Sequence, residues 1–299
     1  MDRFHLMTVF VAVADEESFA GAARKLAMSP PAVTRAIAAL EQRLGIQLLT
    51  RTTRYVRATD AGLRYLEHAR RIIAEADEAD EVAAGVHAAP RGQLAVTAPV
   101  LFGKMFVMPS MVEYLKRFPD MSITALFLDR VVNLLEEGMD VGIRLGALPD
   151  STMRAIGVGH VRRVVCASPA YLKARGTPRT PADLAAHCII AASPVSPAVD
   201  WKFFKGKKPV NVKLAPRLSV TSNDAAIVAA MQGFGITRLM SYQVSACLAA
   251  GQLKAVLTDY EPPRLPIHVL HLEGRQASAK VRAFVDLLVE TLRADKALN

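Results

Sequence analysis

Cysteine is scarce in this sequence, and long apolar runs are missing from it. Cys166, Cys188 and Cys247 are too few and too scattered for a disulfide framework or a Cys-x-x-Cys metal knuckle, which favours a reducing compartment. No stretch approaches the roughly 18 apolar residues without a charge that a membrane-spanning helix needs. The apolar stretch near the N-terminus lies between Asp2 and the acidic run 15–17 and lacks a small-residue cleavage site, so we expect a helix rather than a signal peptide. The sequence therefore predicts a cytoplasmic protein with no membrane partner.

Catalytic signatures are missing as well. There is no Gly-x-Ser-x-Gly elbow, no Gly-x-Gly-x-x-Gly turn, no phosphate-binding P-loop and no His-Glu-x-x-His pair. His268 and His271 lie three apart on an expected strand, so they face opposite sides and make poor metal ligands. We therefore expect no enzyme, no catalytic residue, no metal site and no cofactor. The cysteines allow two interpretations, buried structural thiols or redox sensors.

The charge is distributed unevenly along the chain. A length of 299 residues indicates about two domains, and the net charge is +9. Residues 20–57 carry seven basic side chains and a single acid, Glu41, whereas residues 60–81 carry three basic and seven acidic side chains. A basic segment favours an anionic partner such as nucleic acid, although ordinary variation of surface charge would also produce it.

Apolar spacing and capping residues predict three helices at the start of the chain. Residues 3–14 have helical periodicity, and Ser18 can cap a second helix. Ser29 can cap a third, with Pro30 at its first position and Gly45 as its left-handed end. The short link between the second and third helices is typical of a helix-turn-helix.

The second helix of that motif enters the major groove by its N-terminus. Free N–H groups and the helix dipole at that end would attract phosphate. Thr34 and Arg35 could donate to phosphates or base edges, and Pro31 and Ala32 could contact thymine methyl groups. The expected DNA contacts on this helix are Ser29, Pro30, Pro31, Ala32, Thr34 and Arg35.

Residues 46–57 have the pattern of a two-stranded wing. Its residues Arg51, Thr52 and Arg54 would lie along the backbone of the neighbouring groove. The alternative is a three-helix bundle with a hairpin and no ligand.

Residues 59–88 form one long helical run with an apolar stripe near coiled-coil spacing. A lone helix of this length needs a partner for its stripe, and a two-fold dimer would supply one. Leu63, Leu66 and Ile73 are the expected dimer contacts. Packing of the stripe against its own domain is the alternative.

An ordered set of residues runs through the expected helices and wing: Ala22-Ala23, Leu26–Ile37, Leu40-Glu41, Leu44-Gly45, Leu48-Leu49, Arg51–Arg54, Ala58-Thr59 and Ala61-Gly62. This set resembles the N-terminal signature of the LysR-type transcriptional regulators. Many members of that family have Gln, Ser and Phe where Pro30, Thr34 and Leu49 stand here, and the lost Gln removes a common base contact. The resemblance implies a homodimer or homotetramer on double-stranded promoter DNA and a small-molecule effector such as a carboxylate or aromatic metabolite, and it allows RNA polymerase as a partner.

Strands alternate with helices from residue 92 onward, which indicates α/β structure with a parallel sheet. Residues 101–118 and 129–137 are expected to be helical. The resemblance implies the two-lobed type 2 periplasmic-binding-protein fold for this part. We therefore expect an α/β effector domain at 90–299, with lobe I at about 90–161 and 266–299 and lobe II at about 162–265. A mainly α winged helix-turn-helix at 1–58 and a linker helix at 59–89 would precede it.

Ligands of open α/β sheets bind beyond the carboxyl ends of strands. By analogy with the family, the expected effector cleft contains residues that follow such strands. Val100 and Leu101 stand where many members have a hydroxyl residue for an effector carboxylate, which suggests a less polar effector or anchoring by helix-end N–H groups. Plain helix capping by Ser222 and Asn223, and an ion pair between the lobes for Arg144, are the alternatives. The expected cleft residues are Val100, Leu101, Phe102, Arg144, Ser222, Asn223 and Ile236.

Two other classes of function stay open. A solute-binding protein has the same two-lobed fold but lacks the first ninety residues, and an architectural DNA-binding protein needs no effector. A redox-sensing regulator is a variant of the main hypothesis. The basic cluster from Lys202 to Lys213 is either a solvated hairpin or a further contact to bent DNA or to an acidic partner.

Overall fold

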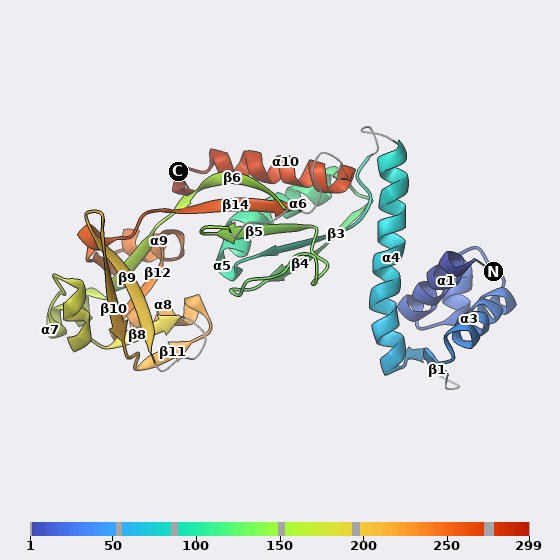
Figure 1. Cartoon of the computed structure of the whole chain (residues 1–299), viewed down its shortest axis with the longest axis horizontal. Helices are drawn as coiled ribbons and strands as arrows, with labels where there is room; N and C mark the ends of the chain where they lie inside the picture. The colour runs from blue at the N-terminus through green and yellow to red at the C-terminus, as the bar shows by residue number, and fades with distance from the viewer. Residues whose placement is uncertain are drawn as a thin grey trace. The chain divides into compact units, whose positions relative to one another are not determined.

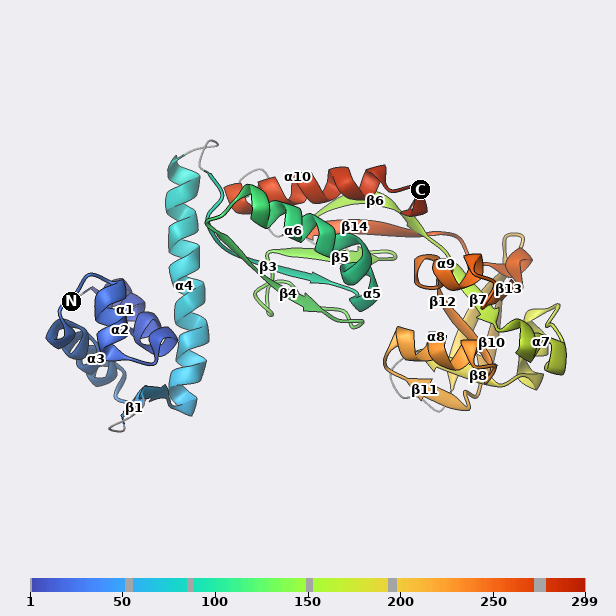
Figure 2. The same cartoon turned by 180° about the vertical axis from the view of Figure 1, so that it is seen from behind.

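The computed structural model describes residues 2–51, 56–84, 89–148, 153–192, 198–271 and 278–298. It divides into two compact units, Met1–Ala88 and Ala89–Asn299. Figures 1 and 2 show both units from opposite sides. No helix in the described ranges is long and apolar enough to span a bilayer.

The first unit contains three short helices, a two-stranded hairpin and one long helix. The caps that the sequence predicts are largely confirmed: Ser18 Oγ accepts from the N–H of Gly21 at 3.1 Å, Pro30 occupies the first turn of its helix, and Gly45 ends that helix with φ +67°. Ser29 occupies the N-cap position, but its side chain makes no capping hydrogen bond. The elements are α1 (Arg3–Glu16), α2 (Phe19–Lys25), α3 (Pro30–Leu44), β1 (Leu49–Arg51), β2 (Val56–Ala58) and α4 (Asp60–Ala84).

The core of this unit joins α1, α3 and the start of α4. Phe10, Ile37 and Leu40 are fully buried, and Leu66 of α4 packs against the same cluster. Helix α4 begins close against the chain, because a Cβ on Gly62 would lie 2.0 Å from the carbonyl oxygen of Leu48. A glycine is therefore required where α4 starts.

The second unit contains two five-stranded sheets, each with its own helices. The order of the first sheet is β4-β3-β5-β14-β6, with β14 antiparallel to both of its neighbours. Helices α6 and α10 cover one of its faces (Figures 1 and 2), where Tyr114 and Phe284 contact edge to face. The elements are β3 (Gly92–Ala98), α5 (Val100–Phe102), the π-turn η1 (Gly103–Val107), α6 (Met108–Arg117), β4 (Met121–Phe127), β5 (Val141–Leu145), β6 (Arg154–Val161), β14 (Leu265–His271), α10 (Ala279–Ala294) and η4 (Lys296–Leu298).

The order of the second sheet is β11-β8-β12-β7-β13. A separate antiparallel hairpin, β9–β10, covers part of it and contributes Trp201 and Phe203 to its core. The chain enters this sheet at Arg163 and leaves it before Leu265. The elements are β7 (Arg163–Ala167), α7 (Pro169–Arg175), η2 (Pro181–Ala186), β8 (Ile189–Ala192), β9 (Val199–Lys205), β10 (Lys208–Leu214), β11 (Leu218–Val220), α8 (Asn223–Met231), β12 (Ile236–Met240), α9 (Ser241–Ala249), β13 (Lys254–Val256) and η3 (Thr258–Tyr260).

Three expectations about this unit are wrong. Residues 129–137 are not helical but form a loop with turns at 134–138, held by an ion pair between Arg130 and Glu137. Strand β6 was not expected at all, and both sheets are mixed rather than parallel. The sheets are mixed because the strand that returns from one sheet to the other runs antiparallel to its new neighbours. Local sequence does not encode this direction.

Candidate functional site

The N-terminal end of α3 presents an exposed surface. Ser29, Pro30, Pro31 and Arg35 are exposed, and Ala32 and Thr34 are half-buried. The Thr34 hydroxyl donates to the carbonyl of Pro30 at 3.1 Å. Within the described residues Arg35 makes no hydrogen bond or ion pair, so its guanidinium is available to an outside group.

The free N–H groups that were expected at this helix end are not there. Two prolines remove two amide protons from the first turn, and the N–H groups of Ala32 and Val33 both donate to the carbonyl of Ser29, at 2.9 and 3.2 Å. Phosphate attraction at this end therefore depends on side chains and the helix dipole. Arg35 and the Ser29 hydroxyl are the groups that remain.

The wing is anchored by the one acid of the basic segment. Glu41 Oε1 accepts the N–H groups of Leu48 and Leu49, at 2.8 and 3.1 Å, and so fixes the start of β1. The carboxylate thus has a structural role in positioning the wing. Of the expected wing contacts, Arg51 ends β1 but its side chain is not described, and Thr52 and Arg54 lie outside the described residues.

The expected dimer residues on α4 divide between two faces. Leu66 packs into the core of its own unit, and Ile73 is half-buried. Leu63 is 56% exposed, and Ile72, which was not singled out from the sequence, is 38% exposed. Part of the stripe therefore packs against its own domain. Leu63 and Ile72 stay exposed in one chain, but a separation of nine residues places them on opposite sides of the helix.

A cavity of about 620 Å³ lies between the two sheets of the second unit. The loop after β4 and strand β5 line it from the first sheet, and strands β7 and β12 with the starts of α8 and α9 line it from the second. Its volume falls in the range typical of small-molecule sites. Its polar lining residues are Thr97, Asp129, Arg130, Arg144, Arg163, Thr221, Asn223, Arg238, Tyr242 and Gln243.

Only two of the seven expected cleft residues line this cavity. Arg144 and Asn223 do, whereas the side chains of Phe102 and Ile236 are fully buried in the cores of the two sheets. Ser222 caps α8 by accepting the N–H of Ala225 at 3.3 Å, which is the capping alternative.

Val100 and Leu101 do not line the cavity either. The N–H of Val100 donates to Asp129 Oδ1 at 3.0 Å, and Leu101 packs against the core of the first sheet. A carboxylate of the protein thus occupies the helix-end N–H that was expected to anchor an effector.

Asp129 connects the two sheets. Its Oδ2 accepts a hydrogen bond from Asn223 Nδ2 at the start of α8, at 2.7 Å. The loop after β4 and helix α8 belong to different sheets, so this contact bridges the cavity mouth. Closure of the lobes and binding of a ligand can therefore involve the same polar groups. A ligand can compete with the hydrogen bond between Asp129 and Asn223 or strengthen it.

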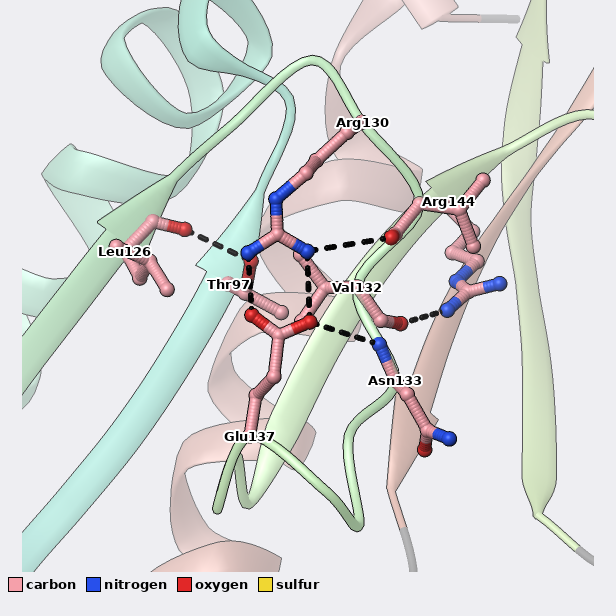
Figure 3. Close-up of polar contacts among 8 residues, drawn as sticks. Thr97, Leu126, Arg130, Val132, Asn133, Glu137 and Arg144 are labelled. Carbon is pink, nitrogen blue, oxygen red and sulfur yellow. Dashed lines mark hydrogen bonds and ion pairs between the residues drawn. The ribbon is translucent and has the colours of Figure 1, made fainter.

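Four arginines reach the cavity, and two are engaged within the first lobe. Arg130 makes a bidentate pair with Glu137, at 2.7 and 2.5 Å, and Arg144 donates to the carbonyl of Val132 (Figure 3). The pair with Arg130 lowers the pKa of the Glu137 carboxyl. Arg144 therefore holds the loop of its own lobe, so the alternative of an ion pair between the lobes is wrong.

The other two arginines belong to the second sheet. Arg238 lies 4.9 Å from the ring centre of Trp201 and donates to the carbonyl of Lys202 at 3.3 Å. Burial, and to a smaller degree the charge of Arg163, lowers the pKa of Arg238 to about 9, and burial lowers the pKa of Arg163. Sequence reasoning missed both residues, because only the pairing of β7 with β12 brings them together.

Tyr242, at the start of α9, packs where the two lobes meet. Its ring contacts Phe102 and Phe106 of the first sheet edge to face, with ring centres 5.4 and 5.7 Å apart. Burial raises the pKa of its phenol, so the group stays neutral, and its oxygen accepts a hydrogen bond from Gln243 Nε2 at 3.3 Å. Helix α9 thus joins the two lobes at the cavity wall.

Cys166 is poorly suited to sense oxidants. Cys166 is fully buried on β7, and burial raises the pKa of its thiol to about 12, with a smaller contribution from nearby Cys247. The thiolate is the reactive form, so Cys166 is unreactive at neutral pH. Cys188 and Cys247 are partly buried.

A helix-turn-helix with a wing, followed by a long helix and a two-lobed α/β unit with a cavity, defines a ligand-binding type of transcriptional regulator. Comparison with known proteins agrees. Residues 4–63 match the bacterial regulatory helix-turn-helix protein, lysR family, and residues 87–293 match the LysR substrate binding domain. The chain belongs to the LysR-type transcriptional regulators, a family of regulators rather than enzymes.

Its relatives span nearly the whole chain. The HTH-type transcriptional regulator CrgA of Neisseria meningitidis serogroup B is 31% identical over 288 residues, which cover 96% of both chains. The probable regulator LtrA of Klebsiella pneumoniae is 30% identical over 291 residues, covering 96% of this chain and 94% of that one. The solved structure of CrgA covers 96% of this chain with a TM-score of 0.60 and 31% identity, and includes 98% of its own. The Vibrio cholerae virulence activator AphB, 24% identical, shares the fold with a TM-score of 0.63 over 97% of this chain and 99% of its own.

Proposed function

We propose that the protein regulates transcription from promoter DNA and that a small-molecule effector in the cavity between its lobes controls this binding. The observation that carries the proposal is the Asp129–Asn223 hydrogen bond across the cavity. It is an exposed polar contact between the lobes, beside the apolar contact of Tyr242 with Phe102 and Phe106, so a ligand can replace it at small cost. A ligand that prefers one arrangement then shifts the population toward it.

The DNA surface in this proposal is the N-terminal end of α3 with the wing. Exposed Arg35 supplies a cation near the groove, and the wing arginines would follow the phosphate backbone. Because Pro30 and Pro31 leave few backbone donors at this helix end, side chains carry most of the recognition. Base contacts then fall to Ser29, Ala32 and Thr34.

A homodimer is the assembly that we infer for DNA binding. The exposed Leu63 on α4 would be covered by α4 of a second chain, and a two-fold dimer presents two recognition helices to two half-sites. A tetramer would pair two such dimers.

A DNA-binding assay with a ligand screen tests the proposal. The full chain is footprinted on the DNA upstream of its own gene, and compounds that raise its thermal stability are then added. We expect protection of two half-sites and a change in affinity or in footprint pattern with at least one stabilising compound. Protection that no stabilising compound alters would favour the effector-independent architectural protein instead.

A further inference from the structure

Three of the four cavity arginines, Arg144, Arg163 and Arg238, have no anion opposite them among the described residues, and the last two belong to the second sheet. Asp129 is the one carboxylate among the described lining residues, and its oxygens accept from the Val100 N–H and the Asn223 amide. Arg163 makes no hydrogen bond or ion pair within the described chain, and Arg238 uses one donor on the carbonyl of Lys202. Most of their guanidinium donors are therefore unused.

The sheet places these two side chains on one face, close together. Strands β7 and β12 are antiparallel, with Met240 opposite Arg163 and Arg238 opposite Val165. Residues opposite one another, and residues two apart along a strand, share a face of the sheet. Arg163 and Arg238 are thus diagonal neighbours, and each lowers the stability of the other's charge in a partly buried site.

Aromatic rings fix one of the two guanidinium groups. Arg238 lies over Trp201 at 4.9 Å and over Phe203 at 5.9 Å, and both rings belong to β9 and are buried in the core of the second sheet. A stacked guanidinium keeps its edge donors in a fixed fork, which suits the planar oxygens of a carboxylate or the oxygens of a phosphate. Arg238 is therefore oriented before a ligand arrives.

We propose that Arg163 and Arg238 bind the anionic group of an organic effector whose apolar part lies against the aliphatic wall of the cavity. This inference rests on the proposed function, since it names the chemistry of the ligand. An oxyanion between the two guanidinium groups would neutralise their repulsion and occupy their unused donors. The wall beside them is apolar, with Leu128, Val131 and Met240 among its residues, so the remainder of the ligand is expected to be hydrocarbon or aromatic.

The position of this site differs from the one expected from the sequence. Anchoring was expected at the end of β3, around Val100, where Asp129 already takes the backbone N–H. The anion site moves to the second lobe, on strands that the sequence pattern did not mark. Repulsion of an anion by Asp129 would further direct its charged end toward Arg163 and Arg238.

The single tryptophan of the chain, Trp201, reports on this site. Full-length protein is titrated with hexanoate, with the neutral hexanamide and with sodium sulfate at constant ionic strength, and tryptophan fluorescence is followed. We expect saturable changes with hexanoate and sulfate, and little change with hexanamide. R163Q leaves Trp201 and its stacked arginine in place, and is expected to weaken hexanoate binding about tenfold or more.

Matched variants separate the site from general effects of charge. R162Q removes the neighbouring arginine, which is exposed and paired with Glu261 outside this cavity, and is expected to bind hexanoate like the wild type. R163K, which keeps the charge, should recover part of the affinity. If R163Q does not fold, R163M replaces it, because an apolar side chain of similar length removes a buried charge without loss of packing.

Two outcomes overturn the inference. One is the absence of a saturable response to hexanoate and to sulfate in the wild type, and the other is equal hexanoate affinity in wild type and R163Q. DNA binding is measured in parallel so that the two proposals fail separately. If anions bind through Arg163 but do not change the affinity for DNA, the proposed function alone is contradicted. If DNA binding responds to neutral ligands and R163Q does not alter it, the anion site alone is contradicted.

Discussion

Asn223 at the start of α8 donates a hydrogen bond to the carboxylate of Asp129 in the loop after β4, at 2.7 Å. The two residues belong to different lobes, and Asp129 is held in turn by the N–H of Val100. The contact is exposed, so it contributes little to overall stability. We expect it to influence how often the cavity opens, as the proposed function requires.

The variant N223D is expected to open the cavity. It places a second carboxylate at hydrogen-bond distance from Asp129, and two such charges repel unless one takes a proton. Amide hydrogen exchange should rise at residues 128–133 and at the start of α8, more in N223D than in N223A. N211D makes the same chemical change on the exposed β10 strand and serves as the control. Equal exchange in N223D and N211D would show that the bridge does not hold the lobes.

The variant R35A is expected to weaken DNA binding at all sequences. Arg35 is exposed near the N-terminal end of α3 and has no partner within the described chain, so its loss removes one phosphate contact. The slope of log affinity against log salt concentration should fall by about 1. R43A removes an arginine from the last turn of the same helix and should change the slope less. If R35A binds promoter fragments with the wild-type slope, α3 does not enter the groove as proposed.

Local structure in the first unit could be read from the sequence, because short-range chemistry decides it. Ser18, Pro30 and Gly45 act within one turn of their own helices, and their roles are confirmed. Even there a local rule was misapplied: two successive prolines, and the carbonyl of Ser29, leave no free N–H in the first turn. The two amide protons that the prolines lack can be counted from the sequence, but the hydrogen bonds to the Ser29 carbonyl cannot.

The cavity was predictable in kind but not in its residues. The analogy with strand ends placed Arg144 and Asn223 on its wall, and both line it. Arg163 and Arg238 come together only through the antiparallel pairing of β7 with β12, and that register is a long-range property. Phe102 and Ile236 were expected in the cleft because they follow or begin strands. Their side chains point instead into the cores, where burial of their apolar surface is more favourable.

Leu63 and Leu66 should respond in opposite ways to substitution. Leu63 is 56% exposed, so L63D is expected to leave the folded chain intact and to lower its mass in solution by breaking the proposed dimer. Leu66 packs in the core of its own unit, so L66A should cost about 2–5 kcal/mol in the free energy of unfolding. Light scattering gives the mass and chemical denaturation the stability. A dimer that survives both L63D and I72D would place the interface elsewhere.

His187 is expected to make the protein less stable in mild acid. The hydroxyl of Tyr171 accepts the N–H of Cys188 at 2.9 Å and lies 3.2 Å from Nδ1 of His187, an arrangement that suits a neutral ring accepting from the hydroxyl. Burial chiefly lowers the pKa of His187, with Arg175 acting in the same sense and Asp183 against it. The unfolded chain therefore takes up its proton first as the pH falls through the ordinary histidine pKa of about 6.5.

The sign of the effect follows from that order of protonation. The stability contributed by neutral His187 is fully present above about pH 6.5 and is lost as the pH falls toward the lowered pKa of the folded state. Denaturant unfolding at about pH 7.5 and about pH 5.5 should show a smaller loss in H187Q than in the wild type, because the glutamine oxygen can accept from Tyr171 and does not titrate. H160Q removes an exposed histidine on β6 as the control. Parallel loss of stability in wild type and H187Q would mean that His187 is protonated in the folded chain as readily as in the unfolded one.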